Sequence, residues 1–281
     1  MNLKQILFFL AITAPTSVVS AALVVADFND LTGGNSNLSG QGGGTGFSGT
    51  WSGTATIDVN SGDLVAPAST NFGLSQSGTA QRVDGDFGGS RQIFRPLSTT
   101  LGAGGGTIWF SMLFNSQSNT ARGGLTFNET ASASTFRDHV YIANGFVRLG
   151  LDNDGQGRAA FSNNVDNLLL GSLSIDPTGD ETISVWVNPD VSGGIGGLGA
   201  ADATFTENAT NLNGGISDLG IISFESTDNA GTVLIDAVRL SDNSDANLAF
   251  AEVTGINVIP EPSVALLVAC GALGLLRRRR S

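Results

Sequence analysis

The sequence predicts an all-β protein, an antiparallel two-sheet jelly-roll sandwich, and three observations predict it. First, 39 glycines punctuate the 281-residue chain, with runs at 42–44 and 104–106. Second, short segments rich in Val, Ile, Phe and Thr lie between these turns, and several alternate with period two. Third, no long window sustains a helical repeat, and the weak helical stripe at 166–173 is short. At least a dozen short strands favour a large jelly roll over an immunoglobulin-like fold.

The expected strands follow in chain order, and two of them alternate most clearly. Residues 107–114 place four large apolar side chains on one face, and residues 182–187 do the same with three aliphatic ones. Asn144-Gly145 between two expected strands is typical of a two-residue hairpin turn. The other strands are expected at 23–28, 55–59, 92–97, 124–127, 139–143, 146–151, 203–206, 220–225 and 232–240.

Several of these segments also carry a family resemblance. The opening run 26–30 leads through a glycine-rich stretch to Trp51, and the apolar segments 107–111, 183–189 and 234–240 follow. Together they resemble the concanavalin A-like (LamG-type) sandwiches of exported bacterial proteins. The resemblance implies one sandwich domain over residues 22–242. Within its last strand, Asp236 interrupts an apolar run and requires a partner, for which Arg239 is one candidate.

Residues 1–21 have the composition of a secretory signal peptide. Lys4 supplies the positive charge, an apolar region follows at 6–12, and Pro15 ends it. Small residues then offer a cleavage site after Ala21, with cleavage after Ala22 as the alternative. We therefore expect the Sec machinery and signal peptidase as partners, and export from a bacterial cell.

The C-terminal residues 260–281 have three parts in a fixed order. Pro-Glu-Pro comes first, then the apolar stretch 263–276, then four arginines. A 14-residue helix spans about 21 Å against roughly 30 Å of hydrocarbon, so this would be a short transmembrane segment, with its arginines cytoplasmic. An ordinary short tail anchor is the alternative interpretation. Residues 243–259 are expected to form a linker between the sandwich and this tail.

This tail resembles the bacterial PEP-CTERM sorting signal. The resemblance implies recognition by an exosortase-like membrane protease or transpeptidase, release to the cell surface or extracellular matrix, and a link to extracellular polysaccharide. It assigns processing to Pro260, Glu261 and Pro262, and retention and topology to Arg277, Arg278, Arg279 and Arg280.

Charge and cysteine content exclude several function classes. The full chain has a net charge of −12, but residues 22–262 hold eight arginines, no lysine and all 25 acids, a net charge of −17. Such a body repels phosphate backbones, which argues against a nucleic-acid partner. The single cysteine, Cys270, lies in the apolar tail, which excludes an intramolecular disulfide, thiol catalysis and a cysteine zinc site in the body.

One segment resembles half of a calcium loop. Asp152 and Asp154 alternate with other residues before a glycine turn, but the twelfth position is Asn163 where an EF-hand has glutamate. An ordinary Asp/Asn/Gly turn explains the same residues. Calcium is therefore a weak expectation, and no other metal or cofactor is expected.

The sequence supplies no catalytic constellation. Glycoside hydrolysis needs two nearby carboxylates, and Glu225 and Asp228 would lie on opposite faces of a strand. His139 is the only histidine, and no nucleophile-elbow motif accompanies it. Aromatic rings could stack on sugars or fill the core, and the sequence leaves this open for Trp51, Trp109, Trp186 and Tyr141.

These observations predict an exported, non-catalytic cell-surface or matrix protein, sorted by an exosortase-type system and associated with extracellular polysaccharide. A carbohydrate-binding module with a specific glycan ligand is the first alternative. A glycoside hydrolase of the concanavalin A-like class is the second.

Overall fold

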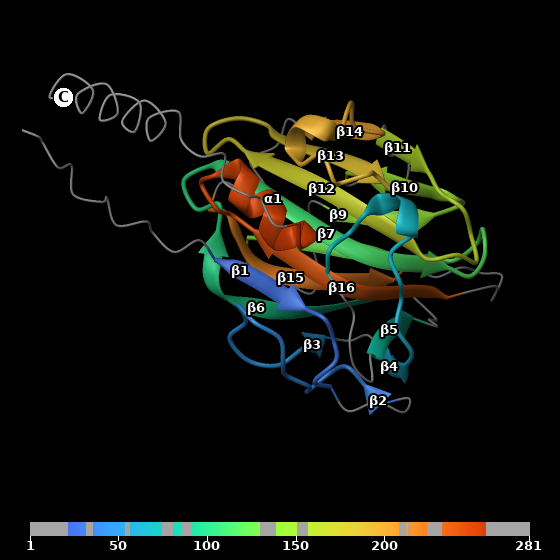
Figure 1. The fold of residues 1–281 in the computed structure, drawn as a ribbon. Helices are drawn as coiled ribbons and strands as arrows, with labels where there is room; N and C mark the ends of the chain where they lie inside the picture. Colours follow the sequence, from blue (N-terminus) through green and yellow to red (C-terminus); the bar gives the residue numbers. More distant parts are fainter. Residues whose placement is uncertain are drawn as a thin grey trace, which may run out of the picture.

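Two antiparallel sheets pack face to face into a sandwich (Figure 1), which confirms the all-β two-sheet fold. The structure is a computed structural model, and it describes residues 22–31, 36–53, 57–74, 81–85, 91–129, 139–150, 157–207, 212, 214–223 and 232–256.

The larger sheet has nine strands, and half of its pairings join strands far apart in the chain. Its first strand, β1 (Leu23–Ala26), pairs with the last, β16 (Val233–Ser241). The remaining order is β14 (Ala203–Glu207), β13 (Glu181–Val187), β12 (Asn167–Ile175), β7 (Gly106–Ser116), β16, β5 (Gln81–Gly85), β4 (Asp58–Ser61) and β2 (Ser36–Asn37).

The smaller sheet has seven strands and forms the second layer. The order of the sheet is β11 (Gly157–Ala160), β10 (Phe146–Leu149), β9 (His139–Ala143), β8 (Arg122–Asn128), β15 (Ile216–Ser223), β6 (Arg91–Leu101) and β3 (Ser52–Gly53). Outside both sheets, two short 3-10 helices, η1 (Ala68–Thr70) and η2 (Ile195–Gly197), lie in the loops.

The alternating segments fold as the sequence predicts. Residues 107–114 lie in β7 and residues 182–187 in β13, whose burial alternates along the strand. Asn144 and Gly145 both have positive φ, 54° and 77°, and Ala143 pairs directly with Phe146. These are the features of a type I′ hairpin turn, whose twist matches that of the flanking strands.

Residues 167–173 of the weak helical stripe lie in the strand β12. This strand runs between β7 and β13 in the middle of the larger sheet. Leu169 and Leu173 face the sandwich core, while Leu168 and Leu170 are buried on the outer face. A strand buried on both faces is an apolar run without alternation, and periodicity alone cannot separate it from a buried helix.

Residues 243–256 of the expected linker are a packed part of the body, and residues 257–259 lie outside the described residues. Helix α1 (Ala246–Thr254) lies across the outer face of the larger sheet, over β7 and β16 (Figure 1). Phe250 is fully buried, and its ring meets that of Trp109 edge-on at 5.4 Å. The Asp245 side chain caps the helix by accepting from Asn247 N and Leu248 N. The packed body therefore extends past residue 242 to at least residue 256.

Asp236 is bound by backbone amides rather than by Arg239. Its carboxylate accepts from Leu64 N at 3.3 Å and from Ala237 N at 2.7 Å. Strand β16 shifts register between Asp236 and Arg239, and Ala237 has a positive φ of 50° at this irregularity. Burial lowers the pKa of Arg239, partly offset by the negative charge of Asp27. The expected Asp236–Arg239 partnership is therefore not the one that the fold makes.

Within the described ranges, no helix combines the length and apolar character needed to cross a bilayer. The predicted signal peptide at 1–21 and the predicted anchor at 263–276 both lie outside those ranges.

Candidate functional site

The outward side of the seven-stranded sheet is polar, and we call it the polar face. Strand register defines it, because residues directly opposite one another share a face. On the inner side, Leu125, Val140 and Val147 pack in the sandwich core. The polar face carries the alternate positions: Gln92, Phe94, Arg122, Thr126, Asn128, Tyr141, Phe146, Arg148, Arg158, Asp218 and Ile222.

Two buried amides lie on this face with hydrogen-bonding groups left over. Gln92 is 2% exposed and Asn128 is 3% exposed. Thr126 Oγ1 donates to Asn128 Oδ1 at 3.2 Å. No described residue bonds to either end of the Gln92 amide or to Asn128 Nδ2. A buried polar group without a partner costs about 1–3 kcal/mol, so such groups mark places where water or a ligand completes the bonding.

Gly220 makes room for this arrangement on the central strand β15. A Cβ at this position would lie 2.3 Å from Thr126 Cγ2 and 2.5 Å from Gln92 Nε2. The side chains of Thr126 and Gln92, which come from the two strands flanking β15, therefore lean over the glycine. The amide of Gln92 is held above the middle of the sheet as a result.

Asp218 is the only carboxylate among the described residues of the polar face. It lies directly opposite Asn128, and Ser217 Oγ donates to its Oδ2 at 2.8 Å. Burial raises the pKa of Asp218, and the Ser217 hydrogen bond offsets part of this rise. A two-carboxylate hydrolytic mechanism would require a second acid at about 5–10 Å. The described residues here form a hydrogen-bonding surface of one carboxyl and two amides.

The polar face also collects positive charge and aromatic rings. Arg122, Arg148 and Arg158 are three of the eight arginines between residues 22 and 262. Arg148 lies directly opposite Arg158 on one side and Tyr141 on the other, with its guanidinium 5.9 Å from the Tyr141 ring centroid. Phe146 is exposed two residues away on the same strand. The register therefore places two positive charges side by side on this face.

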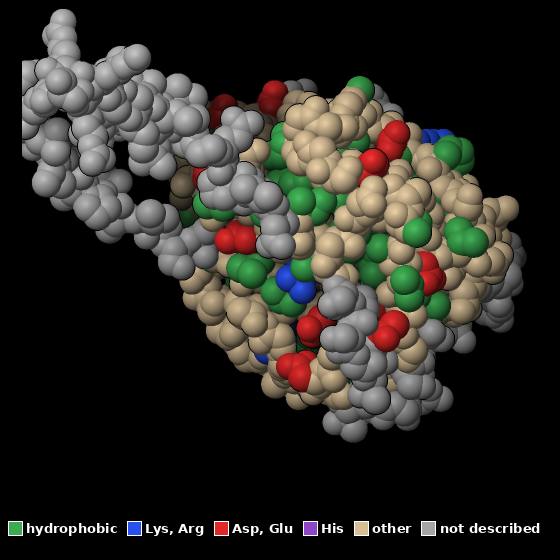
Figure 2. Space-filling view, viewed as in Figure 1, with side chains coloured by type: hydrophobic (Ala, Val, Ile, Leu, Met, Phe, Trp, Pro, Cys, Tyr) green, Lys and Arg blue, Asp and Glu red, His purple; other side chains and the backbone are tan. Residues whose placement is uncertain are grey.

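The other side of the molecule has a different character. Figure 2 looks onto the larger sheet and α1, where acidic side chains are scattered and basic ones are few. The outer face of that sheet is apolar under α1 and under the segment before β5, where Leu64 packs on Leu113 and Leu168. The polar face thus holds three of the eight arginines of a strongly acidic body.

The aromatic candidates from the sequence fall into two groups. Trp51 is buried beside Phe28 and Phe47. Trp109 and Trp186 stack at 5.8 Å beneath α1, so both belong to the packing of the helix. Tyr141 alone among the four lies on the polar face, and it is 3% exposed.

Most of the other sequence candidates lie outside the described residues. These include the calcium candidates Asp152 and Asp154, the pair Glu225 and Asp228, and the sorting residues 260–262 and 277–280. His139 begins β9, at a register position on the polar face opposite Thr126. In the described part of the chain, no group of three or more His, Cys, Asp or Glu residues is arranged to hold a metal ion.

The sequence missed Gln92, Asn128, Arg148, Arg158 and Asp218, although a signal for one pair was present. A two-residue turn at 144–145 pairs residue 143 with 146, and hence Tyr141 with Arg148. Nothing local indicates the pairing of β15 with β6 and β8, which brings Asp218, Asn128 and Gln92 together.

No protein-family model and no curated protein matches this sequence. Similar solved structures include a protein of unknown function from Shewanella oneidensis MR-1, with 10% identity, coverage of 82% of this chain and 90% of that chain, and a TM-score of 0.45. A GH131 β-glucanase catalytic domain from Podospora anserina has 12% identity, coverage of 68% and 81%, and a TM-score of 0.41. The exoplasmic domain of VIP36, bound to Ca²⁺ and Man2, has 7% identity, coverage of 68% and 80%, and a TM-score of 0.38. Likenesses this distant concern the β-sandwich and carry no argument about ligand or activity.

Proposed function

We propose that this protein is an exported, non-catalytic component of the cell surface or extracellular matrix, built on a concanavalin A-like sandwich, and that it binds polysaccharide on the polar face. One observation carries the proposal: arginines, a tyrosine and buried amides with unmet hydrogen-bonding groups share one side of one sheet. Amides bond sugar hydroxyls, and the exposed ring of Phe146, rather than that of the buried Tyr141, can cover the apolar side of a sugar. Asp218 is the one carboxylate that the described residues place on this face, and we propose for it a hydrogen-bonding role toward the polysaccharide.

The charge of the face points to a polysaccharide that carries carboxylate groups. A guanidinium matches a carboxylate through two parallel hydrogen bonds. The whole body is acidic and would repel a polyanion, so binding has to depend on the local field of Arg148, Arg158 and Arg122. A neutral polysaccharide would gain nothing from their charge.

The test measures binding of sodium alginate by calorimetry, with dextran as the neutral comparison. We expect Arg148→Gln and Arg158→Gln each to weaken alginate binding by about tenfold, the loss of roughly 1.4 kcal/mol from a charge-assisted contact. Thr206→Glu is the charge-matched control, because it lowers the net charge equally at an exposed position of β14 in the other sheet. Alginate binding that is absent, or equal in all three variants, would contradict the proposal.

We further propose that residues 260–281 direct sorting by an exosortase-like membrane protein, after export through the Sec machinery and removal of residues 1–21 by signal peptidase. The support is the order Pro260-Glu261-Pro262, apolar stretch, arginine cluster in the sequence.

Replacing Arg277–Arg280 by glutamate should leave unprocessed protein in the membrane fraction, while replacement by lysine should preserve processing because the positive charge remains. Immunoblots of membrane and medium fractions separate these results. Normal amounts of processed protein from the glutamate variant would refute the role of the arginines.

A further inference from the structure

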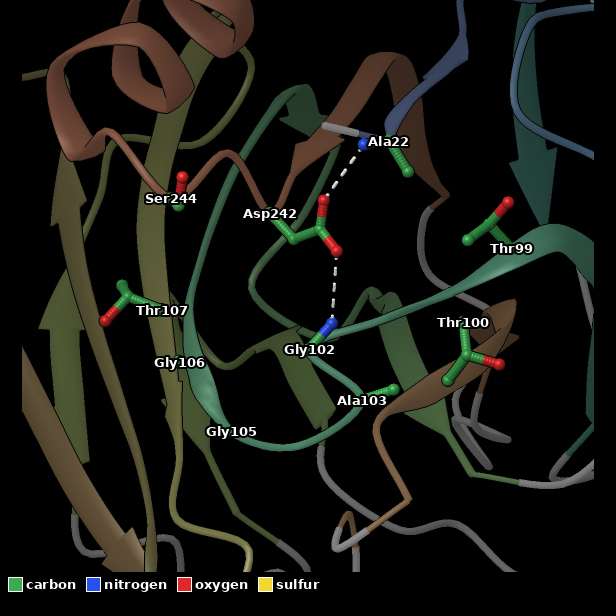
Figure 3. A pocket seen from close by; sticks show the side chains of 10 residues that line it. All are labelled: Ala22, Thr99, Thr100, Gly102, Ala103, Gly105, Gly106, Thr107, Asp242 and Ser244. Carbon is green, nitrogen blue, oxygen red and sulfur yellow. Dashed lines mark hydrogen bonds between the residues drawn. The ribbon is translucent and has the colours of Figure 1, made fainter. Parts of the chain in front are cut away.

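The start of β1 lies against a carboxylate that the proposed function does not use. Ala22 N donates to Asp242 Oδ1 at 3.0 Å, and Gly102 N donates to Asp242 Oδ2 at 3.3 Å. Figure 3 shows the carboxylate held between these two backbone nitrogens. Strand β1 pairs with β16 from Leu23 opposite Ser241, so Ala22 and Asp242 occupy the next step of the same ladder.

Ala22 N is also the atom that removal of the predicted signal peptide would free. Hydrolysis of the Ala21–Ala22 bond adds hydroxyl from water to the Ala21 carbonyl and hydrogen to the Ala22 nitrogen. Near neutral pH the new amine binds one further proton and becomes an ammonium group. A backbone N–H that donates one neutral hydrogen bond is thereby replaced by a cation with three donors at the same carboxylate.

The surroundings can accept this change. Ala22 and Asp242 line an open pocket of about 360 Å³, together with Thr99, Thr100 and Thr107. Threonine hydroxyls and water in such a pocket can take the other donors of the ammonium group.

No other charge competes for the site within its described lining. Asp242 is the only titratable side chain among the pocket residues, and neither β1 nor the β6–β7 turn supplies one. On the packed helix side, Asp245 caps α1 and Glu252 bonds Ser241 Oγ. Both of these neighbouring groups are acids, so the local field favours a cation.

We propose that Asp242 binds the N-terminal ammonium group of the processed protein. Removal of the signal peptide would then create an ion pair that holds the start of β1 against the end of β16. The inference rests on the proposed export and on cleavage after Ala21. Cleavage after Ala22 would remove the bonded nitrogen and put Leu23 at the terminus. Removal of residues 1–21 would thus stabilise the pairing of β1 with β16.

The composition of the chain provides a specific chemical probe. Lys4 is the only lysine and lies in the predicted signal peptide, so a processed chain carries one amine, its α-amino group. Acetic anhydride therefore modifies a single nitrogen, and only in its unprotonated form. An amine whose pKa is raised by one unit reacts about tenfold more slowly at a pH below both pKa values.

The experiment follows acetylation of the exported protein by mass spectrometry over a pH series, after N-terminal sequencing. We expect the protein to begin at Ala22, and Asp242→Asn to acetylate several-fold faster than the wild type. Asp245→Asn is the matched control, because it removes the same charge three residues away, and it should react nearly as the wild type does.

The thermal stability of the same samples gives a second measurement. A carboxylate raises the pKa of the amine in the folded state, so its stabilisation is present below the unfolded pKa of about 8 and is lost as pH rises through the folded pKa. The Tm difference between wild type and Asp242→Asn should therefore shrink from about pH 6 to about pH 10, and acetylation should reduce it at about pH 6.

The outcomes separate the two proposals. A protein found only with residues 1–21 attached overturns the assumed export. A protein that begins at Ala22, but acetylates equally fast with Asp or Asn at position 242, overturns the ammonium site and leaves export standing.

Discussion

At the scale of single residues, Asp236 shows what a buried carboxyl group does to this fold. Burial raises its pKa to about 7, against the opposing effect of its bonds from Leu64 N and Ala237 N, and the charges of Asp63 and Asp27 raise it further. The group is therefore more easily ionised in the unfolded chain than in the folded one. The protonated carboxyl of Asp236 therefore contributes its full stabilisation below about pH 4, and this stabilisation is lost as pH rises through about 7.

We expect the free energy of unfolding of the wild type to fall by a few kcal/mol between about pH 4 and about pH 8 because of this group. Asp236→Asn should lower stability at acidic pH and remove most of this slope. Asp176→Asn, at an exposed aspartate, serves as the control and should keep the slope. Urea denaturation at a series of pH values measures it, and parallel curves for wild type and Asp236→Asn would show that the carboxyl does not titrate as described.

At the scale of elements, α1 turns an apolar surface of the larger sheet into a second core. Phe250 and Val253 are fully buried there against Trp109 and Leu170. Ser111 Oγ also donates to Val253 O at 2.7 Å, so β7 holds the end of the helix by a polar contact as well. Without the helix, the stacked Trp109 and Trp186 rings would face water.

Phe250→Ala should destabilise the protein by about 3–5 kcal/mol, because it removes a fully buried ring and leaves a cavity between helix and sheet. Leu248→Ala is the control on the same helix, since Leu248 is exposed, and it should cost under about 0.5 kcal/mol. Chemical denaturation gives both values. Equal, small losses for the two variants would mean that α1 does not pack as a core element.

The sequence predicts those elements whose pairing partners are close in the chain, or whose two faces differ in polarity. Residues 182–187 alternate because one face of β13 is buried more deeply than the other, whereas residues 108–114 of β7 are buried on both faces. Strand β12 is apolar on both faces and gave no such signal. Helix α1 is short, and its end signals, Asp245 and Gly255, are also common turn residues. The polar face depends on the pairing of β6, β8 and β15, which long-range packing decides and local composition does not encode.

At the scale of the whole molecule, charge opposes folding and shapes binding. Residues 22–262 carry a net charge of −17, yet three arginines gather on one sheet. Self-repulsion of the acids destabilises the compact state, and salt screens it over a Debye length of about 8–10 Å. Attraction between the arginines and an anionic polysaccharide is screened in the same way.

Adding salt up to about 0.3 M should therefore raise the Tm of the free protein and weaken alginate binding. Thermal melts and calorimetry across one salt series measure both effects. Sodium sulfate, compared at equal ionic strength, separates screening from stabilisation by salt exclusion from the surface. Binding that strengthens with salt would show that arginine charge does not attract the polysaccharide.

The pairing of β1 with β16 also sets the order in which the molecule can assemble. Leu23 pairs with Ser241 across a separation of more than 200 residues. Strand β1 therefore cannot pair with β16 until nearly the entire body has been synthesised. High contact order of this kind slows folding. The pairing of the first strand with the last is therefore completed late, which is compatible with the export that we propose.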